Sequence, residues 1–443
     1  MNLPGDVQKI ISVIELHGQA AYAVGGCVRD SILGKTPADW DITTSAKPEE
    51  VKEWFNKTFD TGIEHGTVTV LMHGVGYEVT TYRVDGKYED GRHPKQVTFT
   101  ASLEEDLLRR DFTINAMAYN DSTGLVDLYG GMDDLKNKVI RAVGNPKERF
   151  SEDALRMLRA LRFSAQLGFD IEPDTYEAIK ELAPTLEKIS AERIQVELVK
   201  LLMSDHPEKI EDVYKSGLTK VFLPEFDAMM NTPQKCLHHC YGVGEHTIVT
   251  LKNIAPTRVL RLAALLHDVG KPSTIHQGDD GFDLYTDHEK IGAEMAKGIM
   301  RRLKFDNATI KAVANLVYYH ETRPEITMPN MRRMIIAIGV DAFYDSLALN
   351  KADVLAQSDY MREKKFENIE KMRSFYDEII KNGDCLSIKD MDITGKDLMD
   401  LGVNPGKEMG EMLEVLLEEI LDNPELNNRK YLVERVKSFK VVY

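Results

Sequence analysis

The feature that most constrains the fold of this 443-residue chain is a change of hydrophobic periodicity near residue 104. Before it, short apolar runs between glycine-containing turns predict strands at 21–24, 68–72 and 77–83. After it, apolar residues recur every three to four positions over long stretches, which predicts helices. The clearest of these predicted helices are 151–167, 258–267, 287–303, 307–319 and 341–357. The pattern predicts a small α/β head followed by an all-helical remainder, an α+β chain overall.

Charge and composition exclude several classes of protein. A net charge of −16 argues against a protein that coats nucleic acid without specificity, although a local basic strip is enough to bind phosphate groups. No run of 18 apolar residues occurs, and the N-terminus lacks a signal pattern, so we expect a cytoplasmic protein with no membrane span. The cysteines at 27, 236, 240 and 385 do not complete a zinc cluster, and free thiols are expected.

The first motif that suggests chemistry follows the first predicted strand. Gly25 and Gly26 form a turn that lets backbone N–H groups approach a triphosphate, and Arg29 faces the same phosphates. Asp39 and Asp41 alternate on a strand-like stretch, so both carboxylates point to one face. Two such carboxylates suit Mg²⁺, and two ions roughly 3.5–4 Å apart activate a hydroxyl and stabilise leaving pyrophosphate. Taken singly, a Gly-Gly step is usually a turn and Asp-x-Asp a solvated loop.

This ordered set resembles the signature of polymerase-β-like nucleotidyltransferases, specifically the bacterial class of CCA-adding enzymes and poly(A) polymerases. Four more motifs follow in the order of that class, at 109–116 (RRDFTINA), 127–135, 152–163 and 191–194. The resemblance implies a nucleotidyltransferase head with a small mixed sheet, then an all-α neck, body and tail. It also implies Mg²⁺ in the head, CTP and ATP as substrates and tRNA as partner, while no obligatory protein partner is evident.

The implied reaction joins an RNA 3′-hydroxyl to the α-phosphate of an incoming nucleotide, so the protein needs mainly to position the partners and neutralise charge. Asp39 and Asp41 are the predicted catalytic residues and Mg²⁺ ligands. The predicted nucleotide-binding residues of the head are Gly26, Arg29 and Arg110. By chemistry alone Asp111 is a third acidic candidate, whereas the resemblance suggests a structural or ribose-facing role for it.

Base choice is predicted to lie on the helix at 151–167, where Asp153, Arg156, Arg159 and Arg162 recur every three residues. Cytosine and adenine each present an amino donor beside a ring-nitrogen acceptor, and uracil and guanine present the reverse. A carboxylate from Asp153 and a guanidinium from Arg156 would therefore accept C and A and reject U and G. Arg159 and Arg162 would reach the triphosphate or the RNA backbone. Without the neighbouring motifs, such a stripe is more simply a solvated helix face.

The product of the reaction is predicted from a polar loop at 83–94, which resembles the flexible loop of full CCA-adding enzymes. It has Arg92-His93 where a pair of arginines is more usual in that class. Addition of C, C and A is therefore favoured over addition of A alone. A poly(A) polymerase is a further alternative, which the absence of a long basic tail disfavours.

The helical half carries a second ordered set of possible metal ligands, His246, His267, Asp268, His288, His320 and Asp353. The adjacent His267 and Asp268 end an apolar helix, and the set resembles the HD superfamily of metal-dependent phosphohydrolases. The predicted core ligands are His246, His267, Asp268 and Asp353, and the other two histidines complete a second metal site or contact phosphate. Imidazole and carboxylate ligands suit Mn²⁺, Fe, Ni²⁺, Co²⁺ or Zn²⁺ and do not choose among them.

The motifs divide the chain into four predicted parts. These are the nucleotidyltransferase head (1–140), a neck and body that select nucleotide and bind RNA (141–235), an HD domain (236–360) and a helical tRNA-binding tail (361–443). The HD resemblance implies phosphatase or 2′,3′-cyclic phosphodiesterase activity on RNA ends. A rival from another class is an HD phosphohydrolase whose head only binds nucleotides, and the intact carboxylates of the head argue against it.

Overall fold

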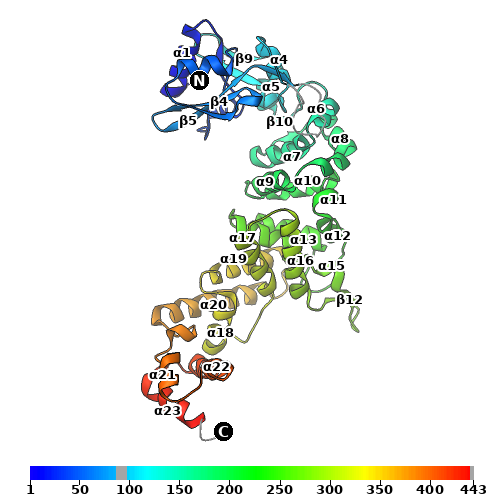
Figure 1. Cartoon of the computed structure of the whole chain (residues 1–443). Coiled ribbons are helices and arrows are strands. Elements are labelled where there is room, and N and C mark those ends of the chain that lie inside the picture. Colours follow the sequence, from blue (N-terminus) through cyan, green and yellow to red (C-terminus); the bar gives the residue numbers. More distant parts are fainter. Residues whose placement is uncertain (86–96, 440–443) are drawn as a thin grey trace. The chain divides into compact units, whose positions relative to one another are not determined.

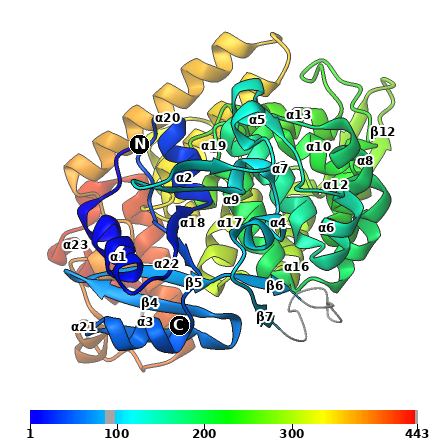
Figure 2. The same ribbon diagram turned by 90° about the horizontal axis from the view of Figure 1, so that it is seen from above.

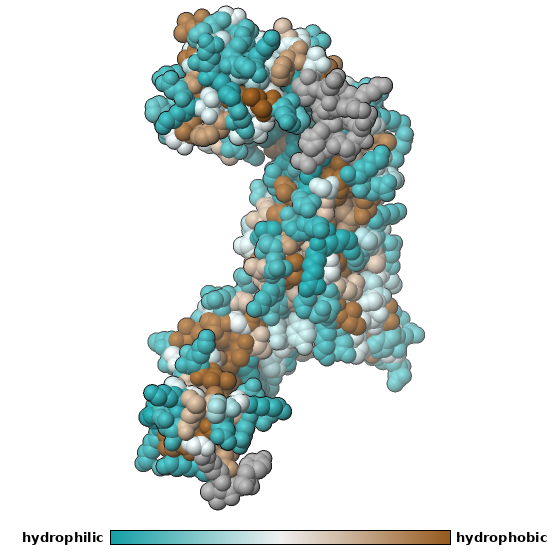
Figure 3. Space-filling model, viewed as in Figure 1, coloured by the Kyte–Doolittle hydropathy of each residue, from teal (hydrophilic) through white to brown (hydrophobic). Residues whose placement is uncertain are grey.

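The computed structural model describes residues 1–85 and 97–439, so most of the predicted nucleotide loop at 83–94 lies outside the described residues. The chain forms two compact units, Met1–Asp227 and Ala228–Tyr443 (Figure 1). Within the described ranges, no helix is long and apolar enough to cross a membrane. The surface seen in Figure 3 is largely hydrophilic, as expected for a chain in which charged residues make up 29%.

A seven-stranded mixed sheet forms the centre of the head (Figures 1 and 2). Its strands lie in the order β3 (Thr58–Gly62), β4 (Thr67–Met72), β5 (Val75–Thr81), β2 (Ile42–Thr44), β1 (Ala21–Val24), β8 (Met117–Asn120) and β9 (Gly124–Asp127). Only β2 and β5 pair in parallel, while the other neighbours are antiparallel. The amphipathic helix α1 (Gly5–Leu16) packs beside β1 through its buried face of Val7, Ile10, Ile11 and Ile14.

The strands predicted at 21–24, 68–72 and 77–83 are confirmed to within two residues as β1, β4 and β5. The prediction that Asp39 and Asp41 alternate on a strand is wrong, because β2 begins only at Ile42. The hairpin of β4 and β5 turns at His73 and Gly74, which both adopt positive φ, as the glycine-containing turn predicted. The stretch from residue 104 was predicted to be helical, yet it contains β8 and β9, an antiparallel pair of four-residue strands joined by a short turn. Strands this short span too few residues to show a clear alternation, so the sequence pattern missed them.

The helix predicted over 151–167 is two helices, α6 (Pro146–Glu152) and α7 (Leu155–Leu167). Asp153 lies between them with extended backbone, φ −142° and ψ 103°. Its Oδ1 accepts the backbone N–H of Leu155 at 3.1 Å, a local hydrogen bond that competes with helix continuation. Two further helices pack beside this pair: α9 (Ala191–Leu202) contacts α7, and α8 (Pro173–Leu182) contacts α6.

The C-terminal unit is almost entirely helical. Its main helices are α13 (Val243–Lys252), α14 (Arg258–Leu266), α16 (His288–Arg302), α17 (Asn307–Tyr319), α18 (Met328–Ile338), α19 (Phe343–Ala356), α20 (Arg362–Asn382), α21 (Gly395–Asp400), α22 (Lys407–Asp422) and α23 (Arg429–Phe439). The helices predicted at 258–267, 287–303, 307–319 and 341–357 are confirmed to within two residues at each end. Strong apolar periodicity made these the most predictable elements of the chain.

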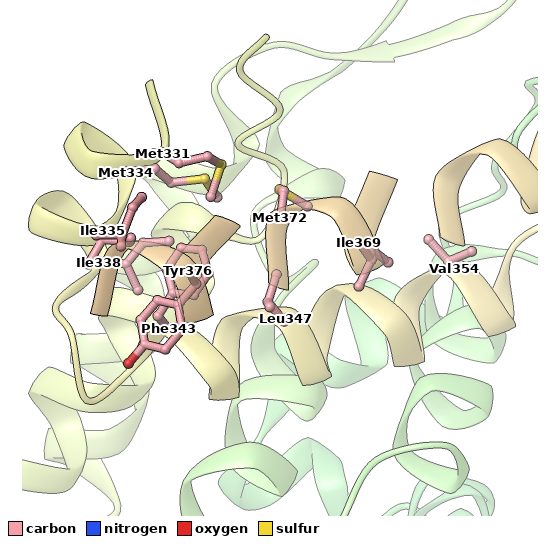
Figure 4. Packing of buried hydrophobic residues seen from close by; sticks show 11 residues of the cluster. Met331, Met334, Ile335, Ile338, Phe343, Leu347, Val354, Ile369, Met372 and Tyr376 are labelled. Carbon is pink, nitrogen blue, oxygen red and sulfur yellow. The ribbon is translucent and has the colours of Figure 1, made fainter. Parts of the chain in front are cut away.

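Two apolar cores hold the end of this unit. Buried residues of α18, α19 and α20 pack against one another, with Phe343 and Tyr376 stacked 4.8 Å apart between ring centroids (Figure 4). A second core joins α21, α22 and α23. The buried ion pair of Arg332 with Asp384 (2.6 Å) ties α18 to the end of α20, and the same guanidinium donates to the carbonyl of Leu421 in α22. The predicted α+β class is confirmed, whereas the four-part division stays a prediction.

Candidate active site and metal centre

The carboxylates of the head meet at the start of β2. Asp39 and Asp41 lie on the exposed segment that leads into this strand, just before its first residue. Because β2 pairs in parallel with β5, with Ile42 opposite Val79, Glu78 is brought beside Asp41. Partial desolvation and the negative charge of Glu78 raise the pKa of Asp41, and the positive charge of Arg110 opposes them. A site that raises the pKa of a carboxylate in this way favours binding of a cation.

Glu78 is a candidate functional residue that the sequence analysis missed. It stands on the exposed face of β5, between the buried Tyr77 and Val79, and looks like any solvent-facing strand residue in the sequence. Only the parallel pairing of two strands far apart along the chain places it beside the Asp-x-Asp motif. Once the pairing of Ile42 with Val79 is known, Glu78 is found as the carboxylate that directly precedes Val79, just as Asp41 directly precedes Ile42.

The glycine turn lies against the same group of residues. Gly25 has φ 82°, a conformation that favours glycine, and an added Cβ atom would lie 3.0 Å from Nη1 of Arg110. Gly26 begins α2 (Gly26–Ile32). Burial lowers the pKa of Arg110, and the nearby carboxylate of Asp106 opposes that effect, so the guanidinium stays charged. Turn, cation and carboxylates therefore share one corner of the head.

A buried network links the predicted nucleotide-binding arginines. Arg29 donates from Nη1 to Oδ1 of Asn115 (2.6 Å), and the amide of Asn115 donates to Oδ1 of Asp111 (3.1 Å). Arg159 donates to the other oxygen of Asp111 through Nε (2.9 Å) and Nη2 (2.6 Å). Although burial opposes ionisation, Arg159 and Asn115 lower the pKa of Asp111 to about 2. Asp111 is thus the anchor of the network, with one oxygen engaged by Asn115 and the other by Arg159.

Arg159 and Arg162 of α7 face the neighbouring helix α9. Nε of Arg162 lies 2.6 Å from Glu197 of α9, and its guanidinium stacks 3.7 Å from the centroid of the Phe163 ring. Arg159 also faces Glu197, at 3.8 Å. Arg162 is buried, so its contacts with Glu197 and Phe163 are internal. The role of these two arginines toward triphosphate or RNA backbone stays a prediction.

Asp153 and Arg156 are held near each other by different partners. The carboxylate of Asp153 accepts from Arg193 of α9 at 2.6 Å, and Arg156 pairs with Glu152 at 2.6 Å. Arg156 also donates to the backbone carbonyl of Arg109, which ties α7 to the head motif. The structure does not pair the two side chains with each other. Each retains hydrogen-bonding capacity, since a carboxylate accepts about four hydrogen bonds and a guanidinium donates five.

The six predicted metal-binding residues of the helical unit converge on one buried centre. Nε2 of His246 lies 3.0 Å from Oδ1 of Asp353 and 3.2 Å from Nε2 of His267. Oδ2 of Asp268 lies 3.3 Å from the latter nitrogen. These four residues come from α13, the end of α14 and α19, so three helices supply the first group of ligand atoms.

The remaining two histidines form a second group on the other oxygen of Asp268. Oδ1 of Asp268 lies 3.7 Å from Nε2 of His288 and 3.5 Å from Nε2 of His320. The two imidazole nitrogens are 3.4 Å apart. His288 opens α16 and His320 follows α17. Asp268 therefore stands between two clusters of ligand atoms, an arrangement suited to a bridged pair of cations.

Hydrogen bonds to the backbone fix the tautomer of all four histidines. In each ring Nδ1 faces a backbone carbonyl, at 3.2 Å in His246, 2.8 Å in His267, 2.8 Å in His288 and 2.6 Å in His320. A carbonyl only accepts, so each Nδ1 carries the proton and each Nε2 presents its lone pair to the centre. This is the outer support that metal-binding histidines need.

The buried carboxylate at the middle of the centre fits a cation as well. Among the described residues, no hydrogen bond is aligned with either oxygen of Asp268, although Nζ of Lys271 lies 2.8 Å from Oδ2. Burial opposes ionisation of Asp268, yet the adjacent His267 and the ammonium of Lys271 hold its pKa well below the usual range. Burial lowers the pKa of His288, which favours the neutral imidazole that binds metal.

Comparison with known protein families gives three matches to this chain. A family described as "Poly A polymerase head domain" matches residues 21–141, and one described as "Probable RNA and SrmB- binding site of polymerase A" matches residues 168–230. One described as "tRNA nucleotidyltransferase domain 2 putative" matches residues 275–436. The three matches follow one another along the chain.

Individual proteins resemble the chain over nearly its whole length or over about half of it. A "CCA-adding enzyme" of Ligilactobacillus salivarius is 38% identical over 98% of this chain and 97% of its own. A "CCA-adding enzyme" of Leuconostoc mesenteroides is 60% identical, over 49% of this chain and 55% of its own. The crystal structure of the Bacillus stearothermophilus CCA-adding enzyme in complex with CTP covers 100% of both chains with a TM-score of 0.73 and 28% identity.

Proposed function

We infer the function from the family: the chain belongs to the CCA-adding enzymes and poly(A) polymerases. We propose that it adds C, C and A to immature tRNA 3′ ends from CTP and ATP without a nucleic-acid template. The observation that carries the proposal is the meeting of Asp39, Asp41 and Glu78 beside the Gly25 turn and Arg110. Whole-length similarity to a CCA-adding enzyme favours this product over A-only or poly(A) addition.

In the proposed reaction the 3′-hydroxyl oxygen bonds to the α-phosphorus, the bond to the β-phosphate oxygen breaks, and pyrophosphate leaves. Asp39 and Asp41 would hold Mg²⁺ with Glu78 as a third carboxylate, and the bound ion supplies charge neutralisation and an activated hydroxyl. Arg110 binds the triphosphate from the corner beside the Gly25 turn. The absence of a side chain at that turn leaves the backbone free to approach the phosphates.

We propose that Asp153 and Arg156 read the base. Arg193 fixes the carboxylate of Asp153 from α9, and the backbone of Arg109 and Glu152 fix Arg156. These partners pre-orient both groups, so little side-chain entropy is lost when a base binds. A fixed carboxylate and a fixed guanidinium match the amino group and ring nitrogen shared by C and A. U and G would leave these groups unpaired, at about 1–3 kcal/mol each.

We propose a second function for the helical unit, that of an HD-type, metal-dependent phosphohydrolase. The specific observation is the convergence of four Nε2 atoms and two carboxylates on a buried centre with every Nδ1 engaged elsewhere. A divalent transition metal (Mn, Fe, Ni, Co or Zn) would be held by His246, His267, Asp268 and Asp353, and a second by Asp268, His288 and His320. Bound metal polarises a phosphoryl oxygen and lowers the pKa of water.

The phosphohydrolase reaction would break the bond from phosphorus to an ester oxygen of an RNA end, with water supplying the new oxygen. The chain's own contribution is to hold the ligands rigidly and to keep Lys271 beside Asp268. Hydrolysis of a 2′,3′-cyclic phosphate to a 2′-phosphate, or release of a terminal 3′-phosphate as inorganic phosphate, would leave a free 3′-hydroxyl for extension and would couple the two sites in RNA end repair. Such coupling gives a physical reason for the fusion of the two units.

The test of the main proposal is labelled-nucleotide incorporation with Mg²⁺ into tRNA transcripts that end before CCA, after C and after CC. Each transcript is offered CTP, ATP, UTP or GTP alone and then CTP with ATP. Two C and one A followed by arrest is the expected result. A added only to the CC-ending transcript would make the chain an A-adding enzyme, and long A runs would make it a poly(A) polymerase.

A further inference from the structure

A chain of hydrogen bonds leads outward from the metal centre to a lysine. Nε2 of Gln357 donates to both oxygens of Asp353, at 3.0 and 2.9 Å. Oε1 of the same amide accepts from Nζ of Lys365 at 2.6 Å. The lysine ammonium therefore stands one side chain away from a predicted metal ligand, and Gln357 fixes its position because the amide is buried.

Other polar groups gather around this lysine from separate segments. Nδ1 of His238 lies 3.1 Å from Nζ of Lys365, so the imidazole accepts from the ammonium. Arg323, on the loop after α17, lies 3.6 Å from Oδ2 of Asp353 and keeps 45% of its side chain exposed. Burial and the charge of Arg323 both lower the pKa of Lys365, which reflects two cations held close together. Glu321, an acidic residue of the same loop, has a carboxylate oxygen 3.8 Å from Nε2 of His288.

An exposed aromatic ring completes this group of polar residues beside the metal centre, which is called the mouth from here on. Tyr360 is 46% exposed, and its ring meets that of His238 edge to face with centroids 5.0 Å apart. Ser358 holds the two segments together, because its backbone N–H donates to the carbonyl of His238 at 2.9 Å. An exposed aromatic ring beside paired cations matches one nucleotide, with a base for the ring and a phosphate for the cations.

We propose that this mouth, formed by His238, Arg323, Tyr360 and Lys365, binds the nucleotide that precedes the reacting end of an RNA. Lys365 and Arg323 hold the phosphate of that nucleotide, and Tyr360 with His238 stacks its base. The inference rests on the proposed phosphohydrolase function of the metal centre and names its substrate class. The substrate is the 3′ end of a polynucleotide, and a free mononucleotide leaves the mouth empty.

The test compares two substrates that differ only in the nucleotides before the reacting one, an RNA trinucleotide that ends in adenosine 2′,3′-cyclic phosphate and 2′,3′-cyclic AMP. With Mn²⁺-loaded full chain, kcat/KM for the trinucleotide should fall about tenfold in Lys365→Gln and in Arg323→Gln, the size expected for one charged hydrogen bond. Hydrolysis of 2′,3′-cyclic AMP should fall much less, because this substrate has no preceding phosphate for the two cations to bind. Lys364→Gln is the matched control, because Lys364 is exposed on the same helix. An equal loss on both substrates, or an equal loss in the control, would overturn the proposal.

A second measurement does not depend on hydrolysis. The same trinucleotide with 4-thiouridine before its last nucleotide is cross-linked to the full chain with ultraviolet light, and the cross-linked peptides are identified by mass spectrometry. Cross-links to His238 or Tyr360 are expected, and Lys365→Gln should weaken them. If neither substrate is hydrolysed but these cross-links form, the phosphohydrolase function fails and the binding site stands. Cross-links confined to residues 1–227 would refute the binding site.

Discussion

The head and the helical unit both gather carboxylates, but they hold them in opposite ways. In the head, Asp39 and Asp41 stand exposed on the segment before a three-residue strand. In the helical unit, Asp268 and Asp353 are buried at 1% and 3% exposure, among imidazoles whose Nδ1 atoms are already engaged. In the head, solvent screens the repulsion between the carboxylates. In the buried centre of the helical unit, only a bound cation or an ion pair compensates the negative charge.

This difference predicts how each site depends on its ligand. A buried carboxylate without adequate compensation destabilises the fold, so metal binding at the second centre contributes directly to the stability of its unit. The exposed head carboxylates need Mg²⁺ for chemistry but little for folding.

The sharpest test of the comparison is to disable each site alone. The double variant Asp39→Asn with Asp41→Asn should lower nucleotide incorporation by about 10³-fold, because the carboxylates hold the ion that neutralises the transition state. Hydrolysis of a 2′,3′-cyclic phosphate end should be unchanged. Asp268→Asn should instead lower hydrolysis of the 2′,3′-cyclic phosphate end and leave nucleotide incorporation unchanged. Both activities are measured on one preparation of each variant.

If either variant abolished both activities while calorimetry showed both units folded, the two sites would not be independent. Aspartate to asparagine keeps the side-chain volume, so large packing effects are not expected in the exposed head pair. For the buried Asp268, a lost calorimetric transition would identify unfolding as the cause. A variant that fails in this way is replaced by His288→Gln, which leaves the first ligand group intact.

Metal should stabilise only the helical unit. At a Mn²⁺ concentration about 100 times the dissociation constant, binding contributes about 2.7 kcal/mol, which corresponds to a rise in Tm of about 5–10 °C for a unit of this size. His267→Ala should remove the shift, and His276→Ala should keep it because His276 is exposed outside the centre. Differential scanning calorimetry resolves the transitions. A shift of the head transition instead would contradict the comparison.

The fold was predictable where periodicity was long. The helices that carry His267, His288, His320 and Asp353 were placed to within two residues, so the metal centre followed from spacing and from the His-Asp pair. The break at Asp153 was not predictable, because the residues around it continue a helical pattern and only a local hydrogen bond interrupts it. Short strands such as β8 and β9 carry too little pattern to be separated from helix.

The site residues that could not be predicted from the sequence are those brought in by contacts between segments far apart along the chain. Asp39 and Asp41 were found because they are neighbours in the sequence, whereas Glu78 required the register of β2 against β5. The partners of the arginines were equally hidden, since Glu197 and Arg193 meet α7 only through packing of α9. Residue type and order therefore indicated which groups carry chemistry, and the tertiary contacts determined how each is held.

Glu78 offers a test of intermediate size. Glu78→Gln should lower incorporation by about 10²-fold, less than loss of Asp39 and Asp41, since it removes one carboxylate near the ion and leaves two. The negative charge of Glu78 raises the pKa of Asp41, so the variant should also shift the acidic limb of the pH–rate profile to lower pH. Glu64→Gln, a change in the same sheet region outside the group, is the control. An unchanged rate and profile would remove Glu78 from the site.

The smallest expected effect concerns the anchor of the arginine network. The pKa of Asp111 is lowered to about 2, so its ionised form stabilises the fold by about 2 kcal/mol above the unfolded pKa near 4. A depressed carboxyl pKa means that this contribution is lost as pH falls from about 4 toward 2. Urea unfolding should therefore show that Asp111→Asn has a lower free energy of unfolding than the unmodified chain at pH 6. This difference should become smaller below pH 4. Asp170→Asn, with 92% of its side chain exposed, should show no such difference. A difference in the free energy of unfolding that stays constant with pH would mean that Asp111 stabilises the head through its packing and not through its charge. The head network would then not differ from the buried metal centre in the way proposed above.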